Sequence, residues 1–282
     1  MSSRSLAYEE NPYQLGSYWD RVDSESDYEI PKKHESNLAS IVKIGGGSGI
    51  YIGKHAGKHI VLTNHHVCLG GNVCSKGSWV QFYVKKLWPK VKAYHGSWKE
   101  VDLAILEIDV PKKQEHLYQT IKTRINFEKL DKSSKLYVAG FGAFFNKARV
   151  LTYSNTSDQD CKVISDNHRK IEDPDEKNKF PYKVWSFAHG CDISHGDSGS
   201  AVFSSESHEI VGLTWTGKTP KAKYYQNSDN LSQLLNAPSP AVWRELSYAV
   251  PMFQIKAALV KSLNSPHITS AQREIILSIT GQ

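Results

Sequence analysis

The run Gly196-Asp197-Ser198-Gly199-Ser200 is the strongest candidate for chemistry in this 282-residue chain. A serine between glycines can occupy a tight turn that exposes its hydroxyl group, and the backbone N–H groups of Gly196 and Ser198 can then point at one spot. Two such N–H groups are what an oxyanion hole requires. The alternative is an ordinary glycine turn between two strands, in which the serine only bonds its own backbone.

A serine hydroxyl is a weak nucleophile, so this chemistry also needs a base and an orienting carboxylate. The candidates are His65 and His66, which follow the apolar run at 59–64, and Asp102, which opens another apolar run. Each of them alone is more typical of a structural role. Together with Ser198 they follow the order His, Asp, Ser, which is one of three orders found in serine hydrolase triads. We therefore expect a serine hydrolase.

A framework of short strands must position these residues. From about residue 40 the chain alternates short apolar runs with glycine and polar turns, and no helix separates the runs. This pattern is typical of antiparallel barrels or sandwiches. The expected strands lie at 41–44, 49–53, 59–64, 79–84, 102–108, 135–142, 148–154, 184–190, 200–205 and 209–217.

Helical spacing of apolar residues appears only near the C-terminus, at 252–263. A second helix is expected at 270–279, because Thr269 lies three residues before Gln272 and the two can form a capping box. The remaining polar segments predict an extended leader at 1–37, which lies on a surface or stays mobile, and a charged, solvated loop at 165–183.

A second polar insert, 218–245, could carry a short helix. We expect the inserts 165–183 and 218–245 to flank the site and to form a lid or a surface that recognises a protein substrate.

The charge balance excludes some partner classes. The chain has 35 Lys and Arg against 29 Asp and Glu, a net charge of +6, and its basic residues form scattered pairs rather than a stripe. No nucleic-acid partner is therefore expected.

No run of 18 apolar residues exists, so no membrane span is expected. The first fifteen residues show no signal peptide, but a trimmed protein would look the same, which leaves the compartment open.

The four cysteines are too few for a disulfide scaffold and lack the C-x2-C spacing of a structural zinc site. Free thiols fit the sequence as well as two disulfides do, and two disulfides could connect in three ways. One pairing joins Cys68 to the nearby Cys74, which leaves Cys161 with Cys191.

The pair His55 and His59 lacks the glutamate of the zinc-binding H-E-x-x-H motif, so we expect both side chains on a solvated hairpin. No metal ion and no organic cofactor is required by the chemistry predicted here.

Seven motifs spread over residues 40–262 resemble the trypsin-like serine proteases of the chymotrypsin superfamily. They are GSGIYI, VLTNHHV, VDLAIL, VAGFG, GDSGSAVF, IVGLTWTG and YAVPM. The resemblance is nearer to the bacterial HtrA-type proteases and glutamyl endopeptidases than to digestive trypsin. It implies an all-β fold of two six-stranded antiparallel barrels, with the site in the cleft between them and helices at the C-terminus.

The domain boundaries expected from this resemblance follow the motifs. The N-terminal barrel spans 38–112, a linker spans 113–134, and the C-terminal barrel with a closing helix spans 135–262. A last helix spans 263–282. Because only about 20 residues of this sequence follow residue 262, we do not expect the PDZ domain that HtrA-type proteins carry.

The resemblance also implies a role for each candidate. The family pattern T-N-x-H-V makes His66 the base and leaves His65 as the variable position. Asp102 then orients His66, Ser198 is the nucleophile, and the N–H groups of Gly196 and Ser198 form the oxyanion hole. The expected activity is that of a serine endopeptidase acting on protein or peptide substrates. The alternatives are a catalytically silent or latent binding module on the same fold, and an ester hydrolase.

Substrate preference is expected to depend on Asp192, which lies six residues before Ser198, where trypsin carries its pocket carboxylate. A buried carboxylate there would favour Lys or Arg in the substrate, but a surface turn is an alternative. The strand residues Leu213, Thr214, Trp215 and Thr216 are expected to pair with an extended substrate, although Trp215 fits the core equally well. Glutamate preference is not expected, because the histidine of the glutamyl endopeptidase motif is replaced by Thr214.

One departure from digestive proteases concerns Asp197. No freed I-V-G-G terminus precedes the barrel at the usual distance, so the usual partner of this carboxylate is missing. Asp197 therefore either has another partner or is a solvated turn residue.

Overall fold

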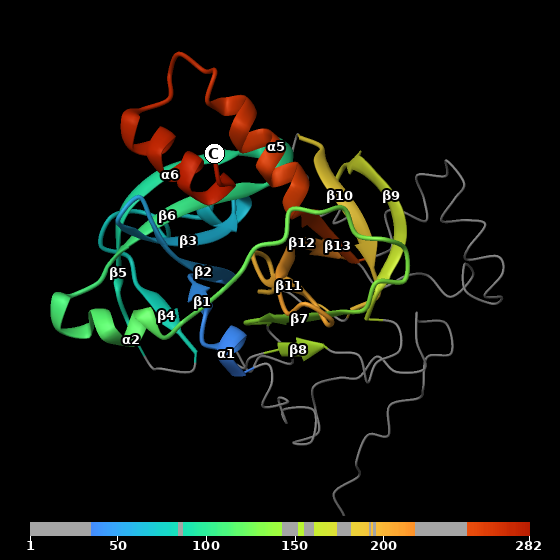
Figure 1. Cartoon of the computed structure of the whole chain (residues 1–282), viewed down its shortest axis with the longest axis horizontal. Helices are drawn as coiled ribbons and strands as arrows, with labels where there is room; N and C mark the ends of the chain where they lie inside the picture. The colour runs from blue at the N-terminus through green and yellow to red at the C-terminus, as the bar shows by residue number, and fades with distance from the viewer. Residues whose placement is uncertain are drawn as a thin grey trace, which may run out of the picture.

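The computed structural model describes residues 35–83, 87–142, 152–154, 161–173, 182–191, 193, 196–217 and 247–282. Two antiparallel sheets lie side by side, and two C-terminal helices pack over them (Figure 1). This arrangement confirms the predicted all-β class and the C-terminal helices.

The first sheet closes into a barrel. Its strand order is β4-β1-β2-β3-β6-β5, and its two edge strands meet at a bridge between Trp79 and Lys90. There the Val80 N–H donates to the Pro89 carbonyl at 2.9 Å. The strands are β1 (Ile41–Ile44), β2 (Gly47–His55), β3 (Lys58–Asn64), β4 (Val80–Phe82), β5 (Lys90–Trp98) and β6 (Leu103–Asp109).

The second sheet has seven strands in the order β8-β7-β11-β12-β13-β10-β9. A bridge between Lys135 and Lys162 joins the starts of β7 and β9, so six strands form a ring. β8 pairs with the later residues of β7, on the edge opposite β11. The strands are β7 (Leu136–Gly140), β8 (Thr152–Ser154), β9 (Val163–Ile171), β10 (Val184–His189), β11 (Ala201–Ser204), β12 (Ile210–Gly217) and β13 (Ser247–Pro251).

Strand β3 is buried on both faces, which explains its near-continuous apolar run. In β3, Val61 packs inside the first barrel, while Ile60 and Leu62 point the other way. They join an apolar cluster that also contains Tyr137 and Trp215 of the second barrel. The barrels are therefore held together by a shared hydrophobic core as well as by hydrogen bonds.

The C-terminal helices complete this shared core. Helix α5 (Met252–Ser262) and helix α6 (Ser270–Thr280) bury apolar faces in it. The predicted capping box is present: the Gln272 N–H donates to the Thr269 hydroxyl at 3.2 Å, and the Thr269 N–H donates to the Gln272 side chain at 2.8 Å. Gln272 also donates to the His95 carbonyl at 2.6 Å, which docks α6 on β5.

The other helical elements of the described chain are short. They are α1 (Glu35–Leu38), α2 (Glu115–Gln119) and the 3-10 turns η3 (His66–Cys68), η4 (Lys99–Val101) and η5 (Lys112–Gln114). None of the helices in the described part of the chain is both long and apolar enough to cross a membrane.

Part of the predicted solvated loop 165–183 is wrong, because β9 occupies residues 163–171. Its backbone pairs with β10, for example Ile171 with Val184, and this pairing does not require apolar side chains. β5 also went unpredicted, since two bulges interrupt its alternation. Residues 174–181, the insert 218–245 and most of the leader 1–37 lie outside the described residues.

The expectation that His59 is solvated is also wrong. The side chain is buried, with Nδ1 2.6 Å from the Tyr51 hydroxyl and Nε2 3.0 Å from the Glu115 carboxylate. These contacts connect α2 to the first barrel. His55, by contrast, is partly exposed.

Both disulfides of the sequence-adjacent pairing are present, Cys68 with Cys74 and Cys161 with Cys191. The second joins the residues that precede β9 and follow β10, so it connects these neighbouring strands at one end. No described cysteine is free.

His189 makes the stability of the second barrel dependent on pH. Its ring is fully buried, and neither ring nitrogen has a hydrogen-bond partner among the described residues. Burial lowers the pKa of His189 to about 3. Unfolded chains take up this proton near pH 6.5, so stability falls as the pH drops from 6.5 towards 3.

We predict that the free energy of unfolding of His189→Met falls less between pH 6.5 and 4.5 than that of the wild type. The difference between the two decreases should be about 2–3 kcal/mol, because the variant has no buried histidine to protonate. Denaturant unfolding at each pH measures the effect, and the same replacement at the exposed His116 is the control. An unchanged pH dependence in His189→Met would contradict the prediction.

Candidate active site

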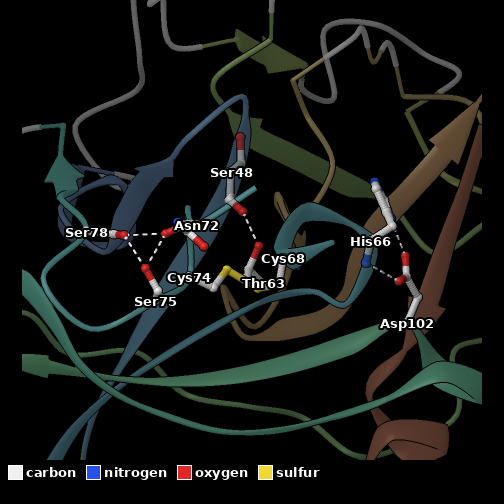
Figure 2. Close-up of a disulfide and its surroundings, with 9 residues drawn as sticks. All are labelled: Ser48, Thr63, His66, Cys68, Asn72, Cys74, Ser75, Ser78 and Asp102. Atoms are coloured by element: carbon white, nitrogen blue, oxygen red, sulfur yellow. Dashed lines mark hydrogen bonds and ion pairs between the residues drawn. A yellow bond between two sulfur atoms is a disulfide. The ribbon is translucent and has the colours of Figure 1, made fainter. Parts of the chain in front are cut away.

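His66 and Asp102 form a close pair at one end of the first barrel. His66 begins η3, one residue after β3 ends, and Asp102 lies between the end of η4 and the start of β6. The His66 Nδ1 lies 2.6 Å from one carboxylate oxygen of Asp102, and the His66 backbone N–H donates to the other at 2.9 Å. Figure 2 shows the two side chains facing each other. An Nδ1–H bonded to a carboxylate leaves Nε2 as the basic nitrogen.

The backbone around Asp102 is built to hold this carboxylate. The residue is fully buried and adopts a left-handed conformation with φ 38°, which is uncommon outside glycine. Its carbonyl accepts hydrogen bonds from the His65 N–H at 2.9 Å and from the Asn64 side chain at 3.0 Å. A strained residue persists when its surroundings determine its conformation in this way.

Tyr182 adds a further donor to the carboxylate, since its hydroxyl lies 3.5 Å from the Asp102 oxygen that also accepts the His66 N–H. Burial, and then the neighbouring Asp102 charge, raise the pKa of Tyr182 above its usual value. The ring of Tyr182 also contacts His65, with ring centroids 5.7 Å apart.

His65 has a different environment from His66. It is buried, and neither of its ring nitrogens bonds a described residue. Burial lowers the pKa of His65, so its ring is held neutral. The Asp102 carboxylate is therefore hydrogen-bonded to the ring of His66 and not to the ring of His65.

A Cys68–Cys74 disulfide lies beside the His66 segment (Figure 2). Cys68 is the last residue of η3, and Cys74 is buried in the core of the first barrel. The disulfide therefore anchors the short turn that carries His66 to that core.

Ser198 lies in a tight turn that packs against the first barrel. Gly196 and Gly199 have φ values of 100° and 87°, which side chains rarely adopt. A Cβ on Gly199 would also overlap the Ser48 carbonyl and lie 2.6 Å from the Thr63 hydroxyl. The glycines of this motif are thus required by the conformation and by the close approach of β2 and β3.

The Ser198 side chain is partly exposed, and its hydroxyl donates to the Trp215 carbonyl at 3.5 Å. Its own carbonyl accepts the Ser48 N–H at 2.7 Å. Because Ser48 is hydrogen-bonded to Thr63, three residues before His66, the turn with Ser198 and the strand leading to His66 are brought to the same region.

Asp197 is buried, which excludes the alternative of a solvated turn residue and leaves the other one, a partner different from a freed N-terminus. The Ser200 hydroxyl donates to its carboxylate at 3.3 Å, and the Ser200 N–H donates to its carbonyl at 2.8 Å. The carboxylate therefore helps to fold the turn from within.

The residues proposed to contact substrate differ in their environments. Leu213 and Thr214 are hydrogen-bonded on both sides, to β13 and to β11 or the serine turn. Trp215 has a buried ring whose Nε1 donates to the Ser186 hydroxyl at 2.9 Å, so its side chain belongs to the core. Beyond it, the described part of β12 pairs only with β13. Asp192 lies outside the described residues.

The structure adds residues that the sequence analysis missed. Asn64 and Tyr182 surround Asp102, and Ser48 binds the serine turn. In the sequence, Ser48 belongs to the motif GSGIYI, which assigns it no role. Among the described residues, no group of three or more His, Cys, Asp or Glu side chains could hold a metal ion.

Comparisons with known proteins agree on one fold. Residues 47–213, more than half of the chain, match the sequence model of a trypsin-like peptidase domain. A search of curated proteins finds no match.

Solved structures with a similar fold include an inactive form of Rv3671c from M. tuberculosis, at 16% identity and TM-score 0.53, covering 83% of this chain and 92% of that one. The active form of the Rv3671c protease matches at 17% identity and TM-score 0.50, covering 80% and 82%. The HtrA-type protease AlgW with a decapeptide matches at 14% identity and TM-score 0.47, covering 77% and 50%. At these identities, the match to the two Rv3671c structures shows a shared fold and nothing more.

We predict that the turn with Ser198 tolerates no side chain at Gly140. A Cβ there would overlap the Ser200 hydroxyl and lie 2.7 Å from the Asp197 carboxylate. Gly140→Ala should therefore lower the free energy of unfolding by about 1–3 kcal/mol, as overpacking does in other cores. The control is Gly46→Ala, where a Cβ meets nothing within 4 Å. Equal stability of the two variants in denaturant unfolding would contradict the prediction.

Proposed function

The chain belongs to the trypsin-like peptidase domain family, and from that premise we propose that it is a serine endopeptidase that works through an acyl-enzyme on Ser198. The observation that most supports this proposal is the 2.6 Å contact between His66 Nδ1 and the buried Asp102 carboxylate. That contact fixes the orientation and the tautomer that a general base needs.

In the proposed mechanism, the Ser198 hydroxyl rotates from the Trp215 carbonyl to His66 Nε2. His66 takes the proton while the serine oxygen attacks a peptide carbonyl, and Asp102 stabilises the imidazolium. The N–H groups of Gly196 and Ser198 receive the negative charge on the carbonyl oxygen. His66 then gives its proton to the leaving amine, and water, activated by the same histidine, releases the acyl group.

An extended peptide substrate fits the free side of β12. Trp215 is a bulge residue, and beyond it Thr216 and Gly217 pair with β13 alone in the described chain, so substrate backbone could pair with the other side of this strand. The Trp215 carbonyl at this edge already accepts the Ser198 hydroxyl. The edge would therefore bring the substrate backbone next to the nucleophile.

A catalytically silent binding module of the same fold is not favoured. Such a module has no need of a base, a carboxylate and a serine, yet His66, Asp102 and Ser198 all keep the residue types that catalysis requires. A left-handed aspartate buried against a histidine is also costly for a purely structural contact.

We predict that a fluorophosphonate labels the wild type on Ser198, with peptide mapping by mass spectrometry as the measurement. Ser198→Ala should abolish labelling, and His66→Ala should reduce it to background. Asp102→Asn should lower kcat on a peptide substrate roughly 10⁴-fold, because the histidine then adopts the wrong tautomer.

The matched control for the histidine is His65→Ala, which should still be labelled, because no described residue bonds the ring nitrogens of His65. Labelling at wild-type rate in His66→Ala, or loss of labelling only in His65→Ala, would contradict the assignment of the base. No labelling of the wild type would contradict the enzyme itself.

We further propose that Asp192 selects Lys or Arg in the substrate. In this proposal the Asp192 carboxylate accepts a charge-assisted hydrogen bond from the Lys or Arg side chain of the substrate. Asp192→Asn should therefore lower kcat/KM for these substrates by about 10–100-fold. Cleavage next to uncharged residues should change little, which is the internal control. A peptide library profile without a preference for Lys or Arg in the wild type would contradict the role of Asp192.

A further inference from the structure

Ser48 lies at the point where the first barrel meets the turn that carries Ser198. It is the second residue of β2 and is fully buried. All of its polar atoms take part in hydrogen bonds. Buried serines are often satisfied by one local contact, whereas these partners come from three distant segments of the chain.

Two of the hydrogen bonds go to the turn itself. The Ser48 N–H donates to the Ser198 carbonyl at 2.7 Å, and the Ser48 hydroxyl donates to the Gly196 carbonyl at 2.7 Å. They hold the two residues whose N–H groups are the proposed oxyanion hole. The second bond fixes the peptide plane between Gly196 and Asp197, which lies between those two N–H groups.

The other two hydrogen bonds connect Ser48 to both barrels. Its carbonyl accepts the Thr63 hydroxyl at 2.6 Å (Figure 2), and Thr63 precedes His66 by three residues. Its hydroxyl oxygen accepts the Phe141 N–H at 2.7 Å, directly after β7. The strand leading to His66 and the turn with Ser198 are therefore linked through a single residue.

We propose that Ser48 is a positioning residue for catalysis, whose hydroxyl holds the turn with Ser198 in register with His66 and keeps the oxyanion hole formed. The inference rests on the proposed serine endopeptidase function. Ser48 itself touches neither substrate nor reacting atoms, and it acts through Gly196 and Ser198.

Catalysis is sensitive to small displacements of the groups that bind the transition state. Loss of one oxyanion donor costs about 10²–10³ in kcat, and a misplacement of about 1 Å can cost 10²-fold. Removing the Ser48 hydroxyl leaves the Gly196 carbonyl and the Phe141 N–H without this partner, while the Ser48 N–H still holds Ser198. The turn should thus loosen without being released.

The test compares Ser48→Ala with Ser40→Ala. Both serines are fully buried in the first barrel, and the Ser40 hydroxyl donates to the Asn37 carbonyl, away from the turn. For each variant kcat and KM on a peptide substrate, the fluorophosphonate labelling rate and the Tm are measured. We expect Ser48→Ala to lower kcat and the labelling rate by about 10–100-fold with KM within threefold, while Ser40→Ala keeps the wild-type kcat.

Thr63 provides a second comparison if Ser48→Ala does not fold. Thr63→Val removes the hydroxyl that holds the Ser48 carbonyl but keeps the shape, whereas Thr63→Ser keeps the hydroxyl. Thr63→Val should lower kcat by about three- to tenfold, and Thr63→Ser should stay near the wild type.

A kcat of Ser48→Ala within threefold of the wild type would overturn the inference, and so would an equal loss in Ser40→Ala. Should Ser48→Ala not fold, equal kcat values for Thr63→Val and Thr63→Ser would overturn it. A wild type that neither turns over nor labels would overturn the proposed function itself. Failure of the inference alone is recognised by an active wild type with an equally active Ser48→Ala.

Discussion

The buried carboxylate of Asp102 is the constraint on which the end of the first barrel depends. A charge removed from water must be met by hydrogen-bond donors, or burial costs several kcal/mol. The chain meets it with the ring and backbone N–H of His66 and with the Tyr182 hydroxyl. The left-handed conformation of Asp102 and the donors to its carbonyl, from His65 and Asn64, keep it in place. The same hydrogen bonds that stabilise the buried carboxylate also orient the His66 ring as proposed for general-base catalysis.

The nucleophile is held by different forces, because it comes from the second barrel. The turn with Ser198 is shaped by glycines in positive-φ conformations and by the buried Asp197. Hydrogen bonds through Ser48 attach it to the first barrel. The two barrels and helices α5 and α6 also share one hydrophobic core. Neither barrel alone contains the proposed site. The rigidity of the contact between the barrels therefore determines how accurately Ser198 is placed relative to His66.

The fold and the local motifs could be predicted from sequence where the signal is local. Apolar runs marked most strands, and the capping box at Thr269 and Gln272 marked the last helix. β9 and β5 were missed, because strand pairing depends on backbone partners distant in sequence and bulges break their alternation. The roles of Ser48 and Tyr182, and the burial of His59 and Asp197, arise from long-range packing, which no pattern near those residues encodes.

The central claim is that Ser198 carries an acyl group during turnover. The most direct measurement is mass spectrometry of protein quenched with acid while it turns over a peptide or an activated ester, followed by mapping of the modified peptide. The account predicts an acyl adduct on Ser198 that accumulates before steady state and disappears when substrate is exhausted. Turnover without any adduct on Ser198, or an adduct on a different residue, would contradict it.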